Sequence, residues 1–299
     1  RQSIPTSYNS IAEMQVFANE NNNSNAMYWE RRLKLIGFCM LIKSDIVKKI
    51  GILDERFTPG NFEDDDYSLR IIQEGYELLL CYDVFIHHYG SATFEKILSE
   101  AEQYYELLKV NRDKFTKKWG FNDKNKISFS WILSQVDFSI SDINILNIGC
   151  GCGSDFLRIS QINKSAKLYG IEKNEKAARF ACRYAQIAVG NIHTMVLDYE
   201  KEQFDYILIN YGIENLEQFE QLLAKVLPYL KSTGTIHFTM KHMLYYPVVA
   251  NFISCKEWGN TYSYFAEENI KSFLERNNFI LTKCSIKKEF FAANIFEYI

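Results

Sequence analysis

Two kinds of hydrophobic spacing follow one another along the second half of the chain. Short apolar runs, typical of buried strands, lie at 143–148, 167–171, 195–197, 204–209 and 235–239. Apolar residues three and four positions apart predict helices at 174–188, 216–230 and 267–277. Because strands that alternate with helical crossovers pair in parallel, the pattern predicts an α/β domain on a parallel sheet.

The first part of the chain, up to about residue 120, combines the same spacings differently. Apolar runs predict strands at 35–42 and 78–86. Helices are predicted at 11–19, 43–50, 67–74 and 95–119. Gly51 and Gly75 directly follow two of these helices, as is common at helix ends. The pattern indicates a second α/β region.

The strand predicted at 143–148 ends in a loop with alternate glycines, Gly149, Gly151 and Gly153. A backbone that turns tightly and presses against a ligand has no room for a Cβ, so the loop suits a nucleotide site. A plain tight turn remains the alternative for the loop alone. Glu172 ends the next strand about 20 residues later, where a carboxylate can bind ribose hydroxyls. The order of these features predicts an adenosine site.

Further motifs continue this order along the chain. They read ILNIGCGCG at 145–153, YGIE at 169–172, FDYI at 204–207, GIENL at 212–216 and LPYLKSTG at 227–234. The series resembles the class I S-adenosylmethionine-dependent methyltransferases. The resemblance implies S-adenosylmethionine as cofactor and a Rossmann-like fold with a seven-stranded mixed sheet, closed by an antiparallel hairpin at 279–287 and 292–299.

The resemblance also implies roles for individual residues. The loop glycines would hold the methionine part of the cofactor, Glu172 the ribose and Asn191 the adenine edge. Asn210 and Tyr211 would line the floor below the transferred methyl group. The aromatic segment 241–264 would lie over the substrate as a lid, or pack the edge of the sheet.

Catalysis asks for few groups, because the sulfonium of the cofactor is already activated. His242 and Glu214 are candidate bases that also suit ordinary structural roles. The sequence departs from the family pattern at Asn147, which replaces an acid, and at Asn215 and Thr233. These departures leave a degenerate module that only binds or scaffolds as the alternative. The intact glycine loop and Glu172 favour an active methyltransferase.

Composition narrows the functional classes. The 299 residues are 47% hydrophobic and 24% charged, enough for two ordinary domains, and the net charge of -3 gives no field that attracts nucleic acid. The longest apolar runs fall short of the roughly 20 residues that span a bilayer, so no transmembrane segment is predicted. Seven cysteines without paired spacing indicate free thiols, a cytoplasmic location and no bound metal.

Four successive acids, Glu63, Asp64, Asp65 and Asp66, open the helix predicted at 67–74. Acids at a helix start commonly cap free N–H groups and suit the helix dipole. A metal-binding Asp-x-Asp is a second interpretation, although that motif normally ends an apolar strand. His87 and His88 at the end of the strand predicted at 78–86 are ligands, bases or merely satisfied polar groups.

The order of motifs again adds information. The runs GFCMLI at 37–42, GILDERF at 51–57, FEDDDYSLR at 62–70 and HHYGS at 87–91 resemble the acceptor-side half of a family 2 glycosyltransferase of the GT-A fold. The resemblance implies that Asp64, paired with Glu63, is the base that deprotonates the acceptor hydroxyl. It places His87 near the diphosphate or its metal.

Together these motifs predict a partial GT-A glycosyltransferase domain at 1–125, a linker at 126–142 and a class I methyltransferase domain at 143–299. The nucleotide-binding first half of a GT-A domain has no counterpart here, so a nucleotide sugar and its divalent metal, Mg or Mn, are expected only with that half. The fusion suggests a bifunctional transferase fragment of glycan or cell-surface polysaccharide synthesis, acting on a small-molecule or glycan substrate.

Overall fold

The computed structural model describes residues 6–88, 101–128, 133–210, 216–239, 267–277 and 279–284. The chain divides into two compact units. The first comprises Arg1–Asn210 and Pro228–His237, and the second Tyr211–Leu227 and Phe238–Ile299. No helix in the ranges described above is long and apolar enough to cross a membrane.

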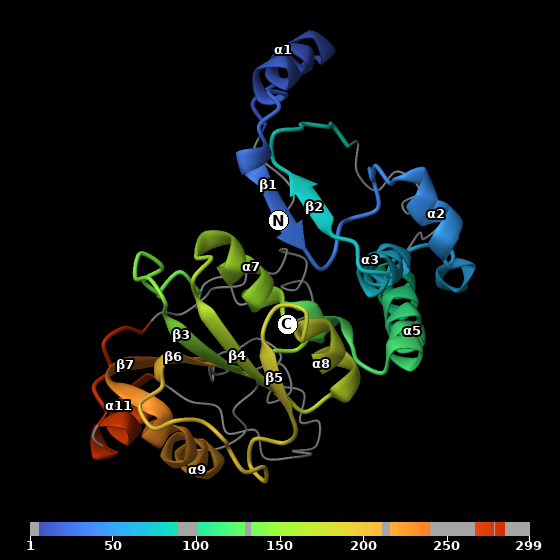
Figure 1. Ribbon diagram of the computed structural model, residues 1–299. Helices are drawn as coiled ribbons and strands as arrows, with labels where there is room; N and C mark the ends of the chain where they lie inside the picture. The colour runs from blue at the N-terminus through green and yellow to red at the C-terminus, as the bar shows by residue number, and fades with distance from the viewer. Residues whose placement is uncertain are drawn as a thin grey trace, which may run out of the picture. The chain divides into compact units, whose positions relative to one another are not determined.

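A five-stranded sheet is the centre of the larger unit (Figure 1). Its strands are β3 (Asn144–Ile148), β4 (Lys167–Glu172), β5 (Gln186–Val189), β6 (Phe204–Ile209) and β7 (Leu230–Phe238). They lie in the order β5-β4-β3-β6-β7, with parallel pairing between β5 and β4, β4 and β3, and β3 and β6. The predicted α/β, Rossmann-like fold with a parallel sheet is confirmed.

The centre of the sheet is buried on both faces. Ile145 and Leu146 on β3 and Ile207 and Leu208 on β6 are fully buried, which explains why these strands read as mostly apolar runs rather than as alternating ones. Helices α7 (Ser154–Ile162) and α8 (Glu175–Ala181) are crossovers of this sheet. Two further helices, α9 (Leu216–Val226) and α11 (Glu267–Arg276), belong to the smaller unit, where Phe219 packs on Phe273.

Three predictions for this half are wrong. The helix expected at 216–230 ends at Val226, and Leu230 already belongs to β7. The helix expected at 174–188 ends at Ala181, because residues 186–189 form β5 and pair with β4. The strand expected at 195–197 does not form; Met195 N–H instead donates to the Asn191 carbonyl and closes a turn at 192–194. Pairing with an open sheet edge here outweighs local helical spacing. The expected hairpin lies largely outside the described residues, and 279–284 contain no strand, so the seven-stranded sheet stays a prediction.

The N-terminal region contains helices packed beside a small antiparallel sheet of β1 (Trp29–Arg32) and β2 (Leu78–Cys81). Its helices are α1 (Ile11–Asn21), α2 (Ser44–Ile50), α3 (Glu63–Gln73) and α5 (Ala101–Trp119), with short 3-10 turns η1 (Ala26–Tyr28), η2 (Glu55–Phe57) and η3 (Asp123–Lys126). Gly51 ends α2 with a φ of 79°, which confirms the predicted stop. The strand predicted at 78–86 is shorter than expected.

The strand predicted at 35–42 does not form. Instead, Leu35 N–H donates to Ser68 Oγ at 3.2 Å and Gly37 N–H to Asp64 Oδ2 at 3.1 Å. Both acceptors lie on α3, so this segment satisfies its backbone donors with helix side chains rather than with a neighbouring strand. Its apolar residues line a cavity, described below.

One buried cluster joins the N-terminal region to the glycine-loop end of the sheet. Phe57, Leu69 and Phe115 pack in the same cluster as Leu157 and Phe180, which come from α7 and α8. The larger unit therefore has a continuous core across the predicted linker. The predicted domain boundaries at 125 and 142 stay a prediction.

Candidate functional site

The glycine loop lies at the carboxyl end of β3, where it leads into α7. Gly149, Gly151 and Gly153 have φ values of 78°, 55° and 87°, in the left-handed region that favours glycine. Gly153 is the N-cap of α7 and has no side chain to offer that helix as a cap. Loop geometry of this kind presents backbone N–H groups at a strand end, where α/β proteins bind ligands.

Glu172, at the end of β4, is bonded to this loop. Its Oε2 accepts from Gly151 N–H at 2.8 Å, and its Oε1 accepts from Asn174 N–H at 2.8 Å. The residue is 5% exposed. Because β3 and β4 are adjacent parallel strands, the structure brings together the two features that the sequence predicted to share one site.

A second segment lies directly on the loop. The carbonyl of Asn125 accepts from Cys152 N–H at 2.7 Å, and the carbonyl of Lys126 accepts from Ser154 Oγ at 2.5 Å. A Cβ built on Gly151 would overlap the Asn125 carbonyl. The group that approaches Gly151 closely here is therefore the Asn125 backbone of the same chain, and only glycine leaves room for it.

The other predicted cofactor residues occupy neighbouring strand ends. Asn191 follows β5, is exposed and accepts from His193 N–H at 3.0 Å. Asn210 follows β6 and is buried, with Nδ2 donating to Asn147 Oδ1 at 3.0 Å and to Asp155 Oδ2 at 2.6 Å. Its Oδ1 is buried and has no hydrogen-bond partner among the described residues. An orphaned acceptor beside the glycine loop fits a site that a ligand completes.

Three predicted residues, Tyr211, His242 and Glu214, lie outside the described residues, as does the lid expected at 241–264. The loop cysteines Cys150 and Cys152 are buried, and burial raises the pKa of both thiols well above the usual range. They are therefore protonated and unreactive at neutral pH. Among the described residues, no group of three or more His, Cys, Asp or Glu is arranged to hold a metal.

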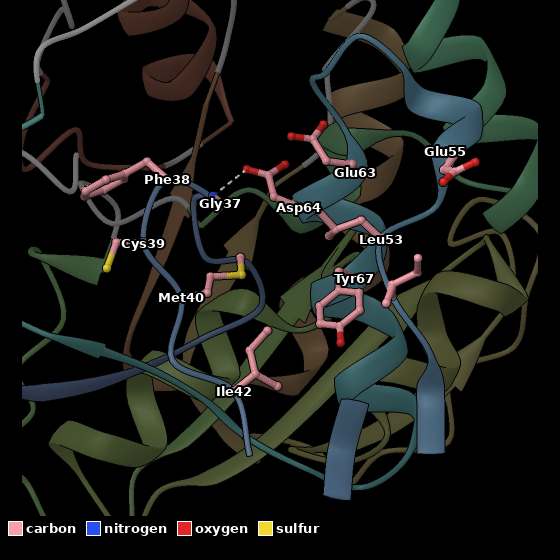
Figure 2. A pocket seen from close by; sticks show the side chains of 11 residues that line it. Gly37, Phe38, Cys39, Met40, Ile42, Leu53, Glu55, Glu63, Asp64 and Tyr67 are labelled. Carbon is pink, nitrogen blue, oxygen red and sulfur yellow. Dashed lines mark hydrogen bonds between the residues drawn. The ribbon is translucent and has the colours of Figure 1, made fainter. Parts of the chain in front are cut away.

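A separate cavity of about 700 Å³ lies in the N-terminal region (Figure 2). Its walls come from the segment before α2, the segment after it, and the first turns of α3. The lining residues are Gly37, Phe38, Cys39, Met40, Ile42, Ile52, Leu53, Glu55, Glu63, Asp64 and Tyr67. The cavity is mostly apolar, and two of the four successive acids reach it.

Those two acids have unusual proton affinities. Burial raises the pKa of Glu63 above its ordinary value. Burial also raises the pKa of Asp64, although Lys34, 3.7 Å away, opposes this. A carboxylate that binds protons more readily beside a cavity has the property that a general base requires.

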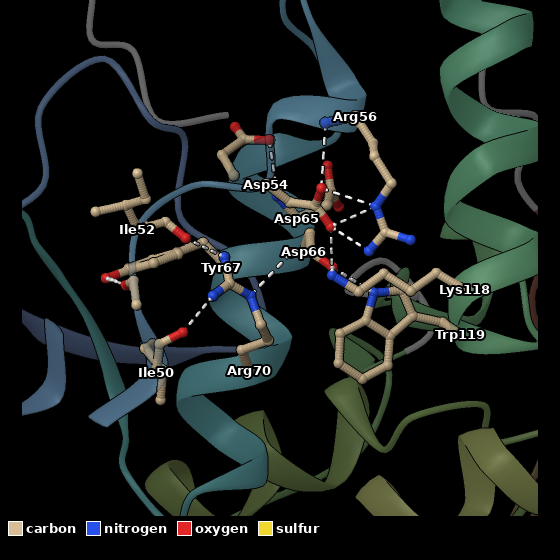
Figure 3. A network of polar contacts seen from close by, with 12 residues as sticks. Ile50, Ile52, Asp54, Arg56, Asp65, Asp66, Tyr67, Arg70, Lys118 and Trp119 are labelled. Carbon is tan, nitrogen blue, oxygen red and sulfur yellow. Dashed lines mark hydrogen bonds and ion pairs between the residues drawn. The ribbon is translucent and has the colours of Figure 1, made fainter. Parts of the chain in front are cut away.

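The other two acids are held by cations instead; Figure 3 shows this for Asp66, which pairs with Arg70 and Lys118. Asp65 pairs with Lys34 and Lys126; burial disfavours its charge, yet these two cations hold its pKa below the ordinary value. Asp66 is fully buried and accepts from Arg70 Nε at 2.9 Å and from Trp119 Nε1 at 2.9 Å. The acid run therefore divides into two cavity residues and two structural ones.

The two histidines also separate. The ring of His87 contacts Tyr8, whose hydroxyl lies 2.5 Å from His87 Nδ1. His88 instead lies against Phe38, with ring centroids 5.1 Å apart, and Phe38 lines the cavity. Neither histidine is among the lining residues of the cavity, and His88 contacts the ring of one lining residue, Phe38.

Asn125 and Asp155 were missed from the sequence as site residues. Asn125 acts through its backbone carbonyl, which leaves no signal in residue type. Asp155 lies two residues after Gly153, separated from it by Ser154. A carboxylate this close to the loop, in a chain where Asn147 replaces the expected acid, is a sequence signal for a site residue.

Comparison with known proteins finds a family match in the second half of the chain. Residues 139–292 match the family described as methyltransferase domain. The demethylmenaquinone methyltransferase of Lactococcus lactis subsp. lactis (strain IL1403) is 27% identical over 104 residues, which cover 32% of this chain and 41% of that protein. The chain thus spans less than half the length of that relative.

Solved structures are more distant. The plantazolicin methyltransferase BpumL in complex with SAH is 21% identical, with a TM-score of 0.38, over 49% of this chain and 60% of that chain. Phosphoethanolamine N-methyltransferase 2 of Haemonchus contortus, in complex with S-adenosyl-L-methionine, is 19% identical, with a TM-score of 0.41, over 64% and 45%. Since the family match at 139–292 covers slightly more than half of the 299 residues, the chain belongs to the methyltransferase domain family.

Proposed function

We propose that the chain binds S-adenosylmethionine at the glycine loop and transfers its methyl group to a small molecule. The observation that carries the proposal is the bond from Gly151 N–H to Glu172 Oε2 at 2.8 Å, which joins the loop to the acid at the next strand end. Each carboxylate oxygen has a second lone pair, so Glu172 still has capacity to accept from the two hydroxyls of a ribose.

The remaining roles follow from position. Asn191 would meet the adenine edge, and Asn210 with Tyr211 would line the floor of the methyl-transfer site. The cofactor supplies an activated methyl group, so the protein has chiefly to align it with the nucleophile and exclude water. His242 and Glu214 remain candidate bases for an alcohol substrate.

The site must also open. Asn125 occupies the space next to Gly151, so a ligand that packs against that glycine displaces the segment 123–126. Part of the binding free energy is then spent on moving this segment, which lowers the apparent affinity.

Equilibrium dialysis with radiolabelled S-adenosylmethionine tests the proposal. We expect saturable, stoichiometric binding to the folded chain that excess unlabelled S-adenosylhomocysteine competes away. Retention of label no greater than with a protein of unrelated fold, while circular dichroism shows native structure, would leave the non-catalytic binding or scaffolding module as the better hypothesis.

A second proposed function, sugar transfer, rests on the placement of Glu63 and Asp64 in the N-terminal cavity. Here Asp64 would take the proton of a glycan acceptor hydroxyl, with Glu63 beside it and His87 nearer the diphosphate. The domain would occupy 1–125, and its nucleotide sugar and divalent metal would require the donor half of a GT-A fold. Surface-glycan synthesis would unite the two activities.

Saccharide binding tests this second proposal. The Gly37 amide donates to Asp64 Oδ2, so its NMR resonance should shift when a neutral disaccharide from a panel enters the cavity. The shift should be lost in Asp64→Asn and kept in Asp45→Asn, a change at an exposed acid on α2. Absence of any saccharide-dependent shift in the wild-type chain would remove the support for an acceptor site.

A further inference from the structure

Asp155 is a buried carboxylate in the first turn of α7, next to the glycine loop. Its Oδ2 accepts from Asn147 Nδ2 at 3.2 Å and from Asn210 Nδ2 at 2.6 Å, and its Oδ1 accepts from Ser128 Oγ at 2.6 Å. Asn147 lies on β3 and Asn210 follows β6. One side chain therefore connects the helix, two adjacent strands and the segment that precedes the sheet.

These bonds determine how the Asn210 amide is oriented. Its Nδ2 donates to Asp155 and to Asn147 Oδ1, so its Oδ1 is directed away from both. A flipped amide would set Oδ1 against the carboxylate oxygen, which is repulsive. Asn210 is 7% exposed, and no group in the part of the chain that the structure describes bonds to its Oδ1. By binding Nδ2, Asp155 thus orients Asn210 so that its buried Oδ1 can accept a hydrogen bond from a ligand.

Position 147, at the end of the strand before the loop, is where the family resemblance leads one to expect an acid. Here the residue is Asn147, and the carboxylate comes from Asp155 instead, 3.2 Å from the Asn147 amide. One carboxylate and one amide are thus in hydrogen-bond contact here, with the carboxylate on the helix and the amide on the strand.

We propose that Asp155 is a positioning residue of the cofactor site, which holds Asn210 so that Oδ1 accepts a hydrogen bond from the ammonium group of an amino-acid-bearing nucleoside. The inference rests on the proposed binding of S-adenosylmethionine and deepens it. The ammonium is a cationic N–H donor, the group that an unpaired amide oxygen near a carboxylate favours.

Two probes separate positioning from general loosening of the fold. S-adenosylhomocysteine has the ammonium, whereas 5′-methylthioadenosine has the same nucleoside and thioether without the amino-acid part. In calorimetry, Asp155→Asn should weaken S-adenosylhomocysteine by about 10-fold or more and change 5′-methylthioadenosine by less than about 2-fold. The double variant Asn147→Asp with Asp155→Asn restores one carboxylate and one amide, and should recover most of the lost affinity.

The outcomes are distinct. An equal loss for both probes in Asp155→Asn, an unchanged affinity for S-adenosylhomocysteine, or a double variant no better than the single one would each overturn the inference. If Asp155→Asn fails to fold, the double variant and Asn210→Ala decide, since Asn210→Ala should also weaken only the ammonium-bearing probe. Wild-type protein that binds neither probe would instead contradict the proposed function.

Discussion

The carbonyl oxygen of Asn125 accepts a hydrogen bond of 2.7 Å from the backbone N–H of Cys152, in the middle of the glycine loop. Next to it, Lys126 forms an ion pair with Asp65 in which both side chains are about 95% buried, at 4% and 5% exposure. The segment 123–126 is therefore attached to the glycine loop on one side and to the acid run of α3 on the other. We expect a ligand that binds at the loop to disturb both attachments.

The first prediction concerns this segment. When S-adenosylhomocysteine is added, amide deuterium exchange should become faster in peptides that cover 122–128 and slower in peptides that cover 149–154, because the ligand replaces Asn125 on the loop. The time course is followed by mass spectrometry. Slower exchange in both regions would show that the segment closes over the ligand rather than leaving.

Gly151→Ala should destabilise the fold as well as the site. The added Cβ would overlap the Asn125 carbonyl at a φ of 55°. Gly51→Ala is the matched control, because Gly51 has a φ of 79° and open space around it. Denaturant melts should give a loss for Gly151→Ala that exceeds the control by at least about 1 kcal/mol. Equal losses would mean that only backbone strain matters and that Asn125 yields freely.

The four acids of α3 should respond unequally to substitution. Asp65→Asn leaves Lys126 buried without its counter-charge and should lower the free energy of unfolding by about 3 kcal/mol. Asp45→Asn, at the same turn of α2 in an exposed pair with Lys48, should cost less than about 0.5 kcal/mol. Urea melts of the two variants compare them directly. A mild effect at Asp65 would return it to the role of an ordinary helix cap.

Asp65 should also make the free energy of unfolding depend on pH. Its pKa is lower in the folded protein than its ordinary value of 3.8, because Lys126 and Lys34 outweigh burial. The carboxylate therefore stabilises the fold above that ordinary pKa, and the contribution is lost as pH falls through the folded pKa. The gap between the unfolding free energies of wild type and Asp65→Asn should stay constant from neutral pH down to about pH 4 and shrink as the pH falls further through the folded pKa. A gap that stays constant below that pH as well would contradict the assigned ion pair.

Much of the sheet could be predicted from the sequence because its strands are buried on both faces. Residues 144–148 and 204–209 form mostly apolar runs, and the structure confirms them as β3 and β6. By contrast, β5 lies at the sheet edge, its residues are half-exposed or exposed, and its spacing resembles a helix. Pairing with β4 decides its structure, and pairing is not a local property of the sequence.

The residues of the candidate sites could likewise be predicted only where local sequence decides their role. Glu172 and the loop glycines could be identified from residue type, because the roles proposed for them need a carboxylate and the absence of side chains. Residue type could not separate Asp64 from Asp65, since the difference is made by Lys126, which is distant in sequence. Nor could it distinguish His87 from His88, because neighbouring residues point to different surroundings, Tyr8 for one and Phe38 for the other.

The most direct test of the central claim is calorimetric titration of the folded chain with S-adenosylhomocysteine. Wild type and Glu175→Gln, which alters an exposed acid paired with Arg179, should bind with the same affinity. Glu172→Gln should bind at least about 10-fold more weakly, because one carboxylate oxygen becomes an amide donor facing backbone N–H groups. Heat of binding absent from wild type at millimolar ligand, or equal affinity in Glu172→Gln, would contradict the assignment of this loop as the cofactor site.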